Sequence, residues 1–519
     1  MAQSRAAGAG HNRCCQLPLA GLQSAGLADG SQPYDGHFLR WLCDSCHQYV
    51  VPDEGATRPE RLASGAYQSA RWCRYFGLHS LPRVWRGAAY AGSCTEPCAV
   101  GYTAGDRCFD YHLSTGEGAT ETICWSSQAQ RRRGGCRVKT ALVTLGRLPK
   151  GLDICRALNE AGWRVIVAEP SERHLCGLSN SVARTLPATA PNDDADAYLN
   201  DTLDIIRGEG VQLVVPVSEE IIHASKLKRH MPNGVRFFGM DHDDLLLLHD
   251  KFAFSKSAAA IGLAVPETAM LGSPEADEMV SQYRVIVKPL YTCSGQGLRF
   301  IERGDALPAK TSQPMLVQRA LPGRHSSSFS VCHEGRVIGT VIYRPEILSD
   351  TVSVAFRQDR HAGAERQWVE QFVAAQNLSG FQSFDFIEDE AGESCAIECN
   401  PRATSGIHFV TAESLAAAIT DPANCRSLEF RNEPVMYQLW PTLTETQKSM
   451  FRWGAGYGHK MTTLLGAKEA NFSWRDPMPV WGQPWAAWQI MRDAMGNGVS
   501  FGEAATQDIA WFGDPPSVG

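Results

Sequence analysis

The most informative part of this chain is residues 383–409, whose sequence is SFDFIEDEAGESCAIECNPRATSGIHF. Residues 384–387 alternate in polarity and carry large apolar side chains, which is typical of a half-buried strand. Residues 388–393 form a polar segment that contains glycine, and residues 396–400 resume the strand-like pattern. We therefore predict a β-hairpin whose turn lies in the polar segment.

The predicted hairpin collects oxygen ligands on one face. Glu398 and Asn400 are two residues apart, so their side chains share a face, and strand pairing can bring Asp385 beside them. Two carboxylates and an amide oxygen suit Mg²⁺, which completes its coordination shell with phosphates and water. Arg402 would add a fixed cation next to the metal, where a transferring phosphate needs one. The alternative is a solvated hairpin with ordinary surface charges, and Pro401 and the apolar flanks argue against it.

The same residues resemble a known family. Asp385, followed thirteen positions later by Glu-x-Asn-x-Arg, resembles the metal-binding segment of the ATP-grasp superfamily, which includes D-alanine–D-alanine ligase, biotin carboxylase and the large subunit of carbamoyl phosphate synthase. The longer string IECNPRATSGIHF, residues 397–409, is similar to a group of ATP-grasp proteins of mostly unassigned substrate and to the ATP-grasp ligase of mycosporine biosynthesis. The resemblance covers about residues 137–515.

The resemblance implies a mixed fold, α/β followed by α+β, divided into several parts. A chain of 519 residues is too long for one hydrophobic core. We expect a Cys-rich and loosely ordered extension at 1–136 and a Rossmann-like domain at 137–245. The two ATP-grasp subdomains are expected at 246–315, with a glycine loop, and at 316–428, with the metal site. A C-terminal packing region at 429–519 completes the chain.

Regular structure becomes recognisable at residue 140. Residues 140–145 predict a buried strand, residues 152–161 an amphipathic helix and residues 163–168 the next strand. This is a βαβ unit with the crossover length of a parallel sheet. The turn at 146–151 has glycine at both ends, but no Lys-Ser/Thr follows, so it is not a phosphate-binding P-loop.

Two glutamates follow the predicted strand at 211–215. Glu219 and Glu220 come just beyond the carboxyl end of that strand, where open α/β sheets place their ligands. They could bind an amine substrate. Favourable charge at a helix N-terminus explains them equally well, so both interpretations stay open.

Two lysines are candidates for binding nucleotide phosphates. Lys288 lies within the apolar strand VIVKP, where a charged group is costly unless an anion pairs with it. Lys251 follows Asp250 at the start of a predicted helix that Gly262 caps, and alone it would be an ordinary exposed lysine. The resemblance implies that both lysines approach the phosphates of ATP.

The resemblance implies further nucleotide contacts on both sides of the predicted subdomain boundary. A glycine loop, with Ser294, Gly295 and Gly297, would close over the phosphates, since glycines let backbone N–H groups approach oxygens. The adenine would contact the crossover segment that contains Gln318, Arg319 and Leu321. His325 stands where most relatives have a ribose-binding glutamate. Histidine can also hydrogen-bond a hydroxyl, but the departure affects nucleotide affinity or choice.

The first 136 residues contain ten of the 17 cysteines. Cys43-x-x-Cys46-His47 and Cys94-x-x-x-Cys98 have spacings that occur in zinc sites, but the two pairs are far apart and unpaired thiols are the favoured interpretation. The first 28 residues lack Asp and Glu, which is typical of an organelle transit peptide and also of a disordered extension. The scattered cysteines of the remainder indicate a reducing, cytoplasmic compartment.

Composition narrows the range of partners. The net charge is −7, so electrostatics give no reason to expect nucleic acid, and no uninterrupted apolar run reaches 18 residues, so we expect no membrane span. In the C-terminal region, Trp481, Trp485 and Trp488 are expected to be core residues rather than a binding platform. The sequence leaves a homodimer open.

The resemblance implies an ADP-forming ligase that makes a carbon–nitrogen bond between a small carboxylate and an amino-acid-like amine. Mg-ATP, with Mn²⁺ as a substitute metal, would convert the carboxylate into an acylphosphate, with Arg402 and Lys288 as catalytic cations. Two alternatives remain. A phosphotransferase would stop at a phosphorylated product, and a nucleotide-binding module without catalysis would be consistent with His325. The intact Asp385, Glu398 and Asn400 set argues against the latter.

Overall fold

In this computed structural model the described residues are 138–291, 297–309, 311, 313–349, 352–389, 391–451 and 456–513. They all belong to one unit of the chain, residues 130–519. The predicted N-terminal extension with its cysteine pairs lies outside the described residues, as do Ser294 and Gly295 of the expected glycine loop.

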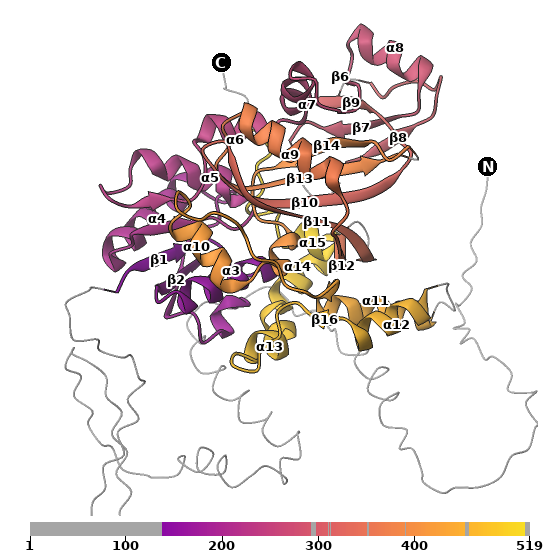
Figure 1. Ribbon diagram of the computed structural model, residues 1–519. Helices are drawn as coiled ribbons and strands as arrows, with labels where there is room; N and C mark the ends of the chain where they lie inside the picture. The colour runs from indigo at the N-terminus through magenta and orange to yellow at the C-terminus, as the bar shows by residue number, and fades with distance from the viewer. Residues whose placement is uncertain are drawn as a thin grey trace, which may run out of the picture. The chain divides into compact units, whose positions relative to one another are not determined.

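The first sheet has five parallel strands and is drawn in indigo and magenta in Figure 1. Its order is β3 (Arg184–Pro187), β2 (Arg164–Glu169), β1 (Thr140–Val143), β4 (Leu213–Val215) and β5 (Arg236–Phe237). The helices between the strands are α3 (Pro149–Glu160), α4 (Ala195–Glu209) and α5 (Glu220–Ser225). The predicted Rossmann-like arrangement is confirmed.

Alternation along β1 covers both faces of this sheet. Ala141 and Val143 pack in one cluster with α3, whereas Leu142 packs in another with Leu203 and Ile206 of α4. The first helix is predicted to begin at residue 152, but α3 begins three residues earlier, at Pro149. Proline has a fixed φ that suits the first helical position.

The second sheet has seven strands and carries the predicted metal hairpin. Its order is β14 (Ser394–Asn400), β13 (Gly380–Glu388), β10 (Arg324–His333), β11 (Arg336–Ser349), β12 (Val352–Asp359), β15 (Val435–Tyr437) and β16 (Lys468–Glu469). Phe384 and Phe386 point to one face, where they pack against Trp368 and Phe372 of α9 (Gly363–Ala375). Asp385 lies between them in sequence and therefore points to the opposite face.

The third sheet has four antiparallel strands. Its order is β6 (Thr268–Met270), β9 (Met315–Arg319), β7 (Val285–Pro289) and β8 (Arg299–Ile301). Helix α6 (His242–His249) and helix α7 (Lys251–Ala260) precede it, and α8 (Pro274–Gln282) packs on it through Ala276, Met279 and Val280. The strand predicted at 285–289 and the helix start at Lys251 are confirmed.

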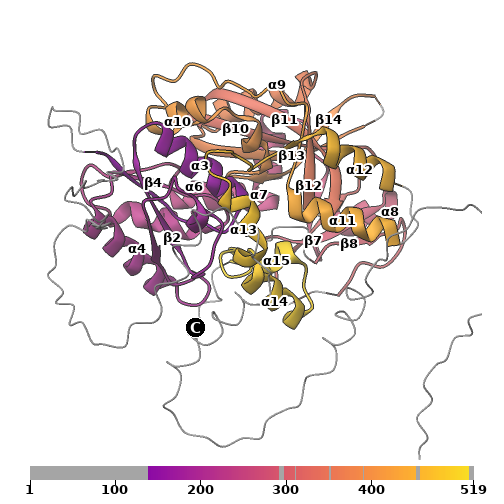
Figure 2. The same cartoon turned by 90° about the horizontal axis from the view of Figure 1, so that it is seen from below.

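The C-terminal part is mostly helical (Figure 2). Its helices are α11 (Leu439–Phe451), α12 (Tyr457–Gly466), α13 (Met478–Ala486), α14 (Trp488–Asn497) and α15 (Phe501–Ala504). It also contributes two short strands to the second sheet, β15 before α11 and β16 between α12 and α13. Helix α10 (Ala412–Thr420) precedes this part of the chain and packs against α3. Among the described residues no helix has the length and apolarity that a membrane crossing requires.

The expectation that the three tryptophans are core residues is wrong. Trp481, Trp485 and Trp488 are 60%, 53% and 53% exposed. Two belong to α13 and the third begins α14, so they do not share one continuous helix face. The residues that bury this region are smaller, Val480 and Ile490 among them.

Candidate functional site

Strands β13 and β14 form the predicted hairpin and place the candidate metal ligands side by side. Asp385 pairs directly with Glu398, and Ser383 pairs with Asn400. The register shifts between Asp385 and Phe386, so β14 has one extra residue, Ile397, at this point. All three candidate ligands thereby share the face of the second sheet that lies opposite α9.

The three side chains contact one another. Asn400 Nδ2 donates to Asp385 Oδ2 at 3.0 Å and to Glu398 Oε1 at 3.2 Å. Ser327 Oγ, on the neighbouring strand β10, donates to Asp385 Oδ1 at 2.5 Å. The amide nitrogen of Asn400 therefore faces the carboxylates, and a half-turn about χ2 would present the oxygen instead.

The two carboxylates differ in acidity. Burial and repulsion from Glu398 raise the pKa of Asp385 to about 7. Burial also acts on Glu398, but attraction by Lys251 and Lys288 outweighs it and lowers the pKa of Glu398 to about 2. Two adjacent carboxylates resist holding two negative charges unless a cation joins them.

Both predicted phosphate-binding lysines are buried near these carboxylates. Lys251 is 5% exposed and Lys288 is 6% exposed. Lys288 Nζ donates to Gln318 Oε1 at 2.9 Å and to the backbone oxygen of Ile397 at 3.4 Å. Burial lowers the pKa of Lys288 to about 8, although attraction by Glu398 opposes the shift. The structure thus brings two cations to the carboxylate pair.

The start of α7 fixes the position of Lys251. Asp250 caps this helix, since its Oδ1 accepts from the backbone N–H of Phe252 at 2.9 Å and of Ala253 at 2.8 Å. Its Oδ2 accepts from the hydroxyl of Tyr291 at 3.1 Å. Tyr291 immediately precedes the expected glycine loop, so one carboxylate ties both predicted phosphate-binding segments together.

Arg402 connects the hairpin to the first sheet. Its Nε lies 2.7 Å and its terminal nitrogen 2.6 Å from Glu219 Oε1. The same terminal nitrogen donates to Asn400 Oδ1 at 3.1 Å. Glu219 and Arg402 are 183 residues apart in sequence, so pattern reasoning gave no reason to pair them.

The two glutamates after β4 have different surroundings. Glu220 accepts from the backbone N–H groups of Val217 at 2.7 Å and Ser218 at 2.9 Å, as expected of a carboxylate at a helix N-terminus. Glu219 pairs with Arg402 instead. Burial would raise the pKa of Glu219, but attraction by Arg402 in particular holds it below its ordinary value.

Lys150 and Ser327 are site residues that the sequence prediction missed. Lys150 Nζ donates to Ser218 Oγ at 2.9 Å and to the backbone oxygen of Ala403 at 2.8 Å. A lysine after a helix-starting proline and a serine in a serine-rich strand carry no signal on their own. Their roles depend on strand and helix packing between distant segments.

The remaining predicted nucleotide contacts occupy varied positions. Gln318 is buried and holds Lys288, while the side chain of Arg319 pairs with Glu267 at 3.1 Å. Leu321 is partly buried and His325 is exposed, on the same face of β10 as Ser327. Gly297 has a φ of +70°, and a Cβ at this position would lie only 3.1 Å from Pro289 Cγ. Nucleotide binding by these residues stays a prediction.

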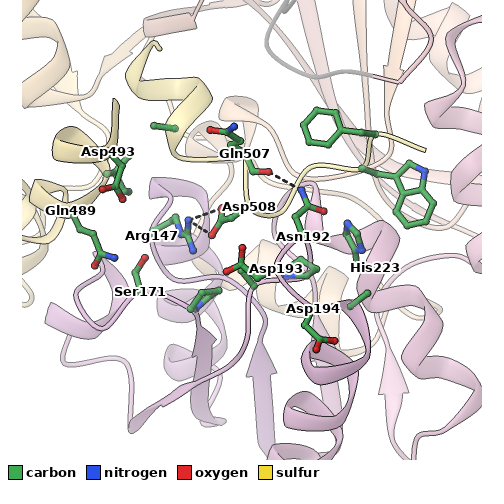
Figure 3. A pocket seen from close by; sticks show the side chains of 18 of the residues that line it. Arg147, Ser171, Asn192, Asp193, Asp194, His223, Gln489, Asp493, Gln507 and Asp508 are labelled. Atoms are coloured by element: carbon green, nitrogen blue, oxygen red, sulfur yellow. Dashed lines mark hydrogen bonds and ion pairs between the residues drawn. The ribbon is translucent and has the colours of Figure 1, made fainter. Parts of the chain in front are cut away.

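A separate cavity of about 910 Å³ opens beyond the carboxyl ends of the first sheet's strands (Figure 3). Segments that follow β1, β2 and β3 line it, together with α5 and the C-terminal tail. Asp508 of the tail pairs with Arg147 at 2.9 Å, and Asn192 donates to the backbone oxygen of Gln507 at 2.7 Å. Its lining does not include the candidate metal ligands or the two lysines.

The donor set of the hairpin is that of a hard cation. Among the described residues no three His, Cys, Asp or Glu side chains are grouped to hold a metal. The predicted set instead combines two carboxylates with one amide, leaving further coordination positions to phosphate and water oxygens, as Mg²⁺ prefers.

Comparison with known proteins finds a domain family that contains these residues. Residues 248–406 match the family described as the ATP-grasp domain. The chain carries an ATP-grasp domain. The match begins just before α7 and ends after Arg402, so it contains both lysines and all three candidate metal ligands.

Related sequences agree with the domain match. The chain is 26% identical over 250 residues to the C-terminal section of the carbamoyl phosphate synthase large chain of Methanopyrus kandleri, an alignment covering 41% of this chain and 43% of the relative. It is 27% identical over 194 residues to the corresponding large chain of Rubrobacter xylanophilus, covering 33% and 17%. The chain thus spans less than half the length of the curated relatives it matches.

Solved structures include a similar fold in N5-carboxyaminoimidazole synthetase from Staphylococcus aureus. The TM-score is 0.47 at 14% identity, covering 61% of this chain and 86% of that one. The assignment of the ATP-grasp domain rests on the family match.

Proposed function

We propose that this chain is an ATP-dependent ligase that joins a carboxylate to an amine through an acylphosphate. The observation that supports it best is the convergence of Asp385, Glu398 and Asn400 with Lys251 and Lys288. Carboxylates for a metal and buried cations for phosphates are what phosphoryl transfer requires. Two relatives are carbamoyl phosphate synthase large chains, and this similarity supports a ligase that forms a carbon–nitrogen bond.

The carboxylate pair fits a divalent cation. Asp385 and Glu398 face each other in register, and burial together with their mutual repulsion raises the pKa of Asp385 to about 7. Mg²⁺, held by oxygens of these two residues and Asn400, would allow both carboxylates to ionise and would neutralise charge on the phosphates of ATP.

The reaction proposed has two displacements. A carboxylate oxygen of the substrate attacks the γ-phosphorus of ATP, an O–P bond forms, and the bond to the bridging oxygen breaks as ADP leaves. The amine nitrogen then attacks the carbonyl carbon of the acylphosphate, phosphate leaves, and the amine proton passes to solvent. Lys251 and Lys288 would hold the phosphates, and Arg402 would stabilise charge as the phosphoryl group transfers.

We also propose the sequence-based division of the chain, with parts at 137–245, 246–315, 316–428 and 429–519. The sheets support this division in part, because strands β1–β5 fall within 137–245 and β10–β14 within 316–428, whereas β9 (Met315–Arg319) of the third sheet crosses the boundary at 315.

Product analysis tests the proposal. The full chain is incubated with Mg-ATP and a panel of small carboxylic acids and amino acids, while ADP and free phosphate are measured. A ligase releases both only when an acid and an amine are present together. ADP without free phosphate would indicate a phosphotransferase, and nucleotide binding without turnover for every pair would favour a non-catalytic module.

A further inference from the structure

The link between Glu219 and Arg402 joins two parts of the chain at the candidate metal site. We infer that Glu219 is a positioning residue, which holds Arg402 away from the metal-binding carboxylates and in contact with Asn400. This role rests on the proposed function. It assigns to the first sheet a direct part in shaping a site whose candidate ligands all come from the second.

Distance and burial support this inference. Two nitrogens of Arg402 lie within 2.7 Å of Glu219 Oε1, in the short range of charge-assisted hydrogen bonds. Glu219 is 3% exposed, so its charge needs a partner, and losing the pair would leave a buried charge uncompensated. The free energy of pairing therefore fixes the guanidinium.

The guanidinium in turn contacts Asn400, whose amide nitrogen faces the two carboxylates. Arg402 donates to Asn400 Oδ1, and Asn400 Nδ2 donates to both Asp385 and Glu398. A chain of hydrogen bonds therefore runs from Glu219 to the carboxylate pair. Without Glu219, Arg402 would be a cation close to two carboxylates, and pairing with either would compete with Mg²⁺ for the same oxygens.

A purely structural role for Glu219 is not required to hold these segments together. Lys150 already bridges them, since it donates to Ser218, next to Glu219, and to Ala403, next to Arg402. His408 and Asp153 add a second buried link between α3 and the segment after β14. Removing the charge of Glu219 should therefore leave the two segments in place while releasing Arg402.

The test compares the affinity of the full chain for Mn²⁺ in the presence of a non-hydrolysable ATP analogue, measured by electron paramagnetic resonance. We expect Glu219→Gln to weaken Mn²⁺ binding roughly 10–100-fold, the usual size of an effect from a residue behind the metal ligands, because the released guanidinium would compete with the metal for the carboxylate oxygens. Glu220→Gln is the matched control. It removes an adjacent buried carboxylate that holds backbone N–H groups, so it should lower the melting temperature and leave Mn²⁺ affinity unchanged.

A double-mutant cycle shows whether Glu219 acts through Arg402. In an Arg402→Gln background the released cation no longer exists, so Glu219→Gln should have no further effect on Mn²⁺ affinity. Equal weakening in both backgrounds would overturn the inference, as would a raised KM for the amine substrate with unchanged Mn²⁺ affinity, which would make Glu219 an amine ligand.

Failure of the proposed function gives a different result. If the unmodified chain does not bind Mn²⁺ with the nucleotide analogue, or if Glu398→Gln binds it equally well, the metal site itself is wrong, and the role of Glu219 is withdrawn with it. If Glu398→Gln abolishes binding and Glu219→Gln does not change it, only the positioning role fails.

Discussion

Lys288 and Lys251 show how far the requirements of the site depart from those of folding. A buried ammonium group loses its hydration, and partial pairing with carboxylates does not fully restore that free energy. The lowered pKa of Lys288 reflects the remaining penalty. The buried lysines of the site therefore carry a desolvation penalty, which an anionic ligand would reduce.

Replacing Glu398 by Gln should remove ATP turnover while leaving the fold intact. The variant keeps the size of the side chain but removes a charge that would bind the metal, and we expect at least about a 100-fold loss of turnover. Phosphate release measures it, and circular dichroism checks the fold. Glu393→Gln, in the exposed turn of the same hairpin, is the control, and turnover equal to that control would contradict the metal assignment.

The stability cost of Lys288 should depend on pH. Its pKa is about 8 in the folded chain and 10.5 ordinarily, so between these values the unfolded chain binds more protons and stability rises with pH. Relative to Lys288→Met, the unmodified chain should gain about 3 kcal/mol from below pH 8 to above pH 10.5, since the pKa difference is about 2.5 and each unit is about 1.36 kcal/mol.

Urea denaturation of both chains across this range, without metal or nucleotide, measures the difference in unfolding free energy. A constant difference would show that Lys288 titrates normally.

Local patterns were enough to predict part of the site. Asp385 and Glu398 belong to one hairpin, and the spacing of apolar residues fixed which side chains share a face. The partners of Arg402 and Asp385 were not predictable, because Glu219 and Ser327 are 183 and 58 residues away from them. Only tertiary packing brings those segments together.

At the element scale, helix α7 shows a boundary that the sequence specifies well. Asp250 is an N-cap residue, Gly262 follows the helix with a φ of +78°, and the predicted start at Lys251 agrees with the structure. The tryptophans of α13 and α14 show the opposite. Residues 481, 485 and 488 are expected in the core, but they lie on two helices separated at Ala487 and all three are more than half exposed.

Asp250→Ala should affect stability and nucleotide affinity together. Losing the cap lowers the free energy of unfolding by about 1 kcal/mol. The substitution also releases two groups that Asp250 holds, the first helical turn with Lys251 and the hydroxyl of Tyr291. Ser273→Ala removes the cap of α8, whose Oγ accepts from Ala276 N–H at 3.3 Å, and provides a matched control. Thermal unfolding and fluorescent ATP-analogue binding measure both effects, and equal nucleotide affinity in the two variants would refute the expected coupling.

On the scale of the whole molecule, the first and second sheets share one hydrophobic core. One cluster of buried apolar side chains contains Val143 of β1 and Leu158 of α3, and it continues to Phe329 of β10 and Phe356 of β12 in the second sheet. Helices α3 and α10 pack against each other within it. Sequence patterns identified the strands of both parts, but they could not show that the two parts bury a common apolar surface.

A shared core predicts cooperative unfolding of the two sheets. Backbone amides in β1 and in β13 should exchange hydrogen through the same global opening, with similar free energies. Hydrogen-exchange mass spectrometry measures both. Faster exchange in β1 at a clearly lower opening free energy would show that the first sheet unfolds independently.

The pairing of Glu219 with Arg402 also constrains how such a protein can change during evolution. A substitution at either position leaves a buried charge without its counter-ion, so the two positions are expected to covary among relatives. Chimeric proteins that combine the first sheet of one relative with the remaining sheets of another should be productive only when both members of this pair come from the same parent or are compatible. Chimeras joined near residue 245 would therefore fold, but they would be active only with a matched pair at positions 219 and 402.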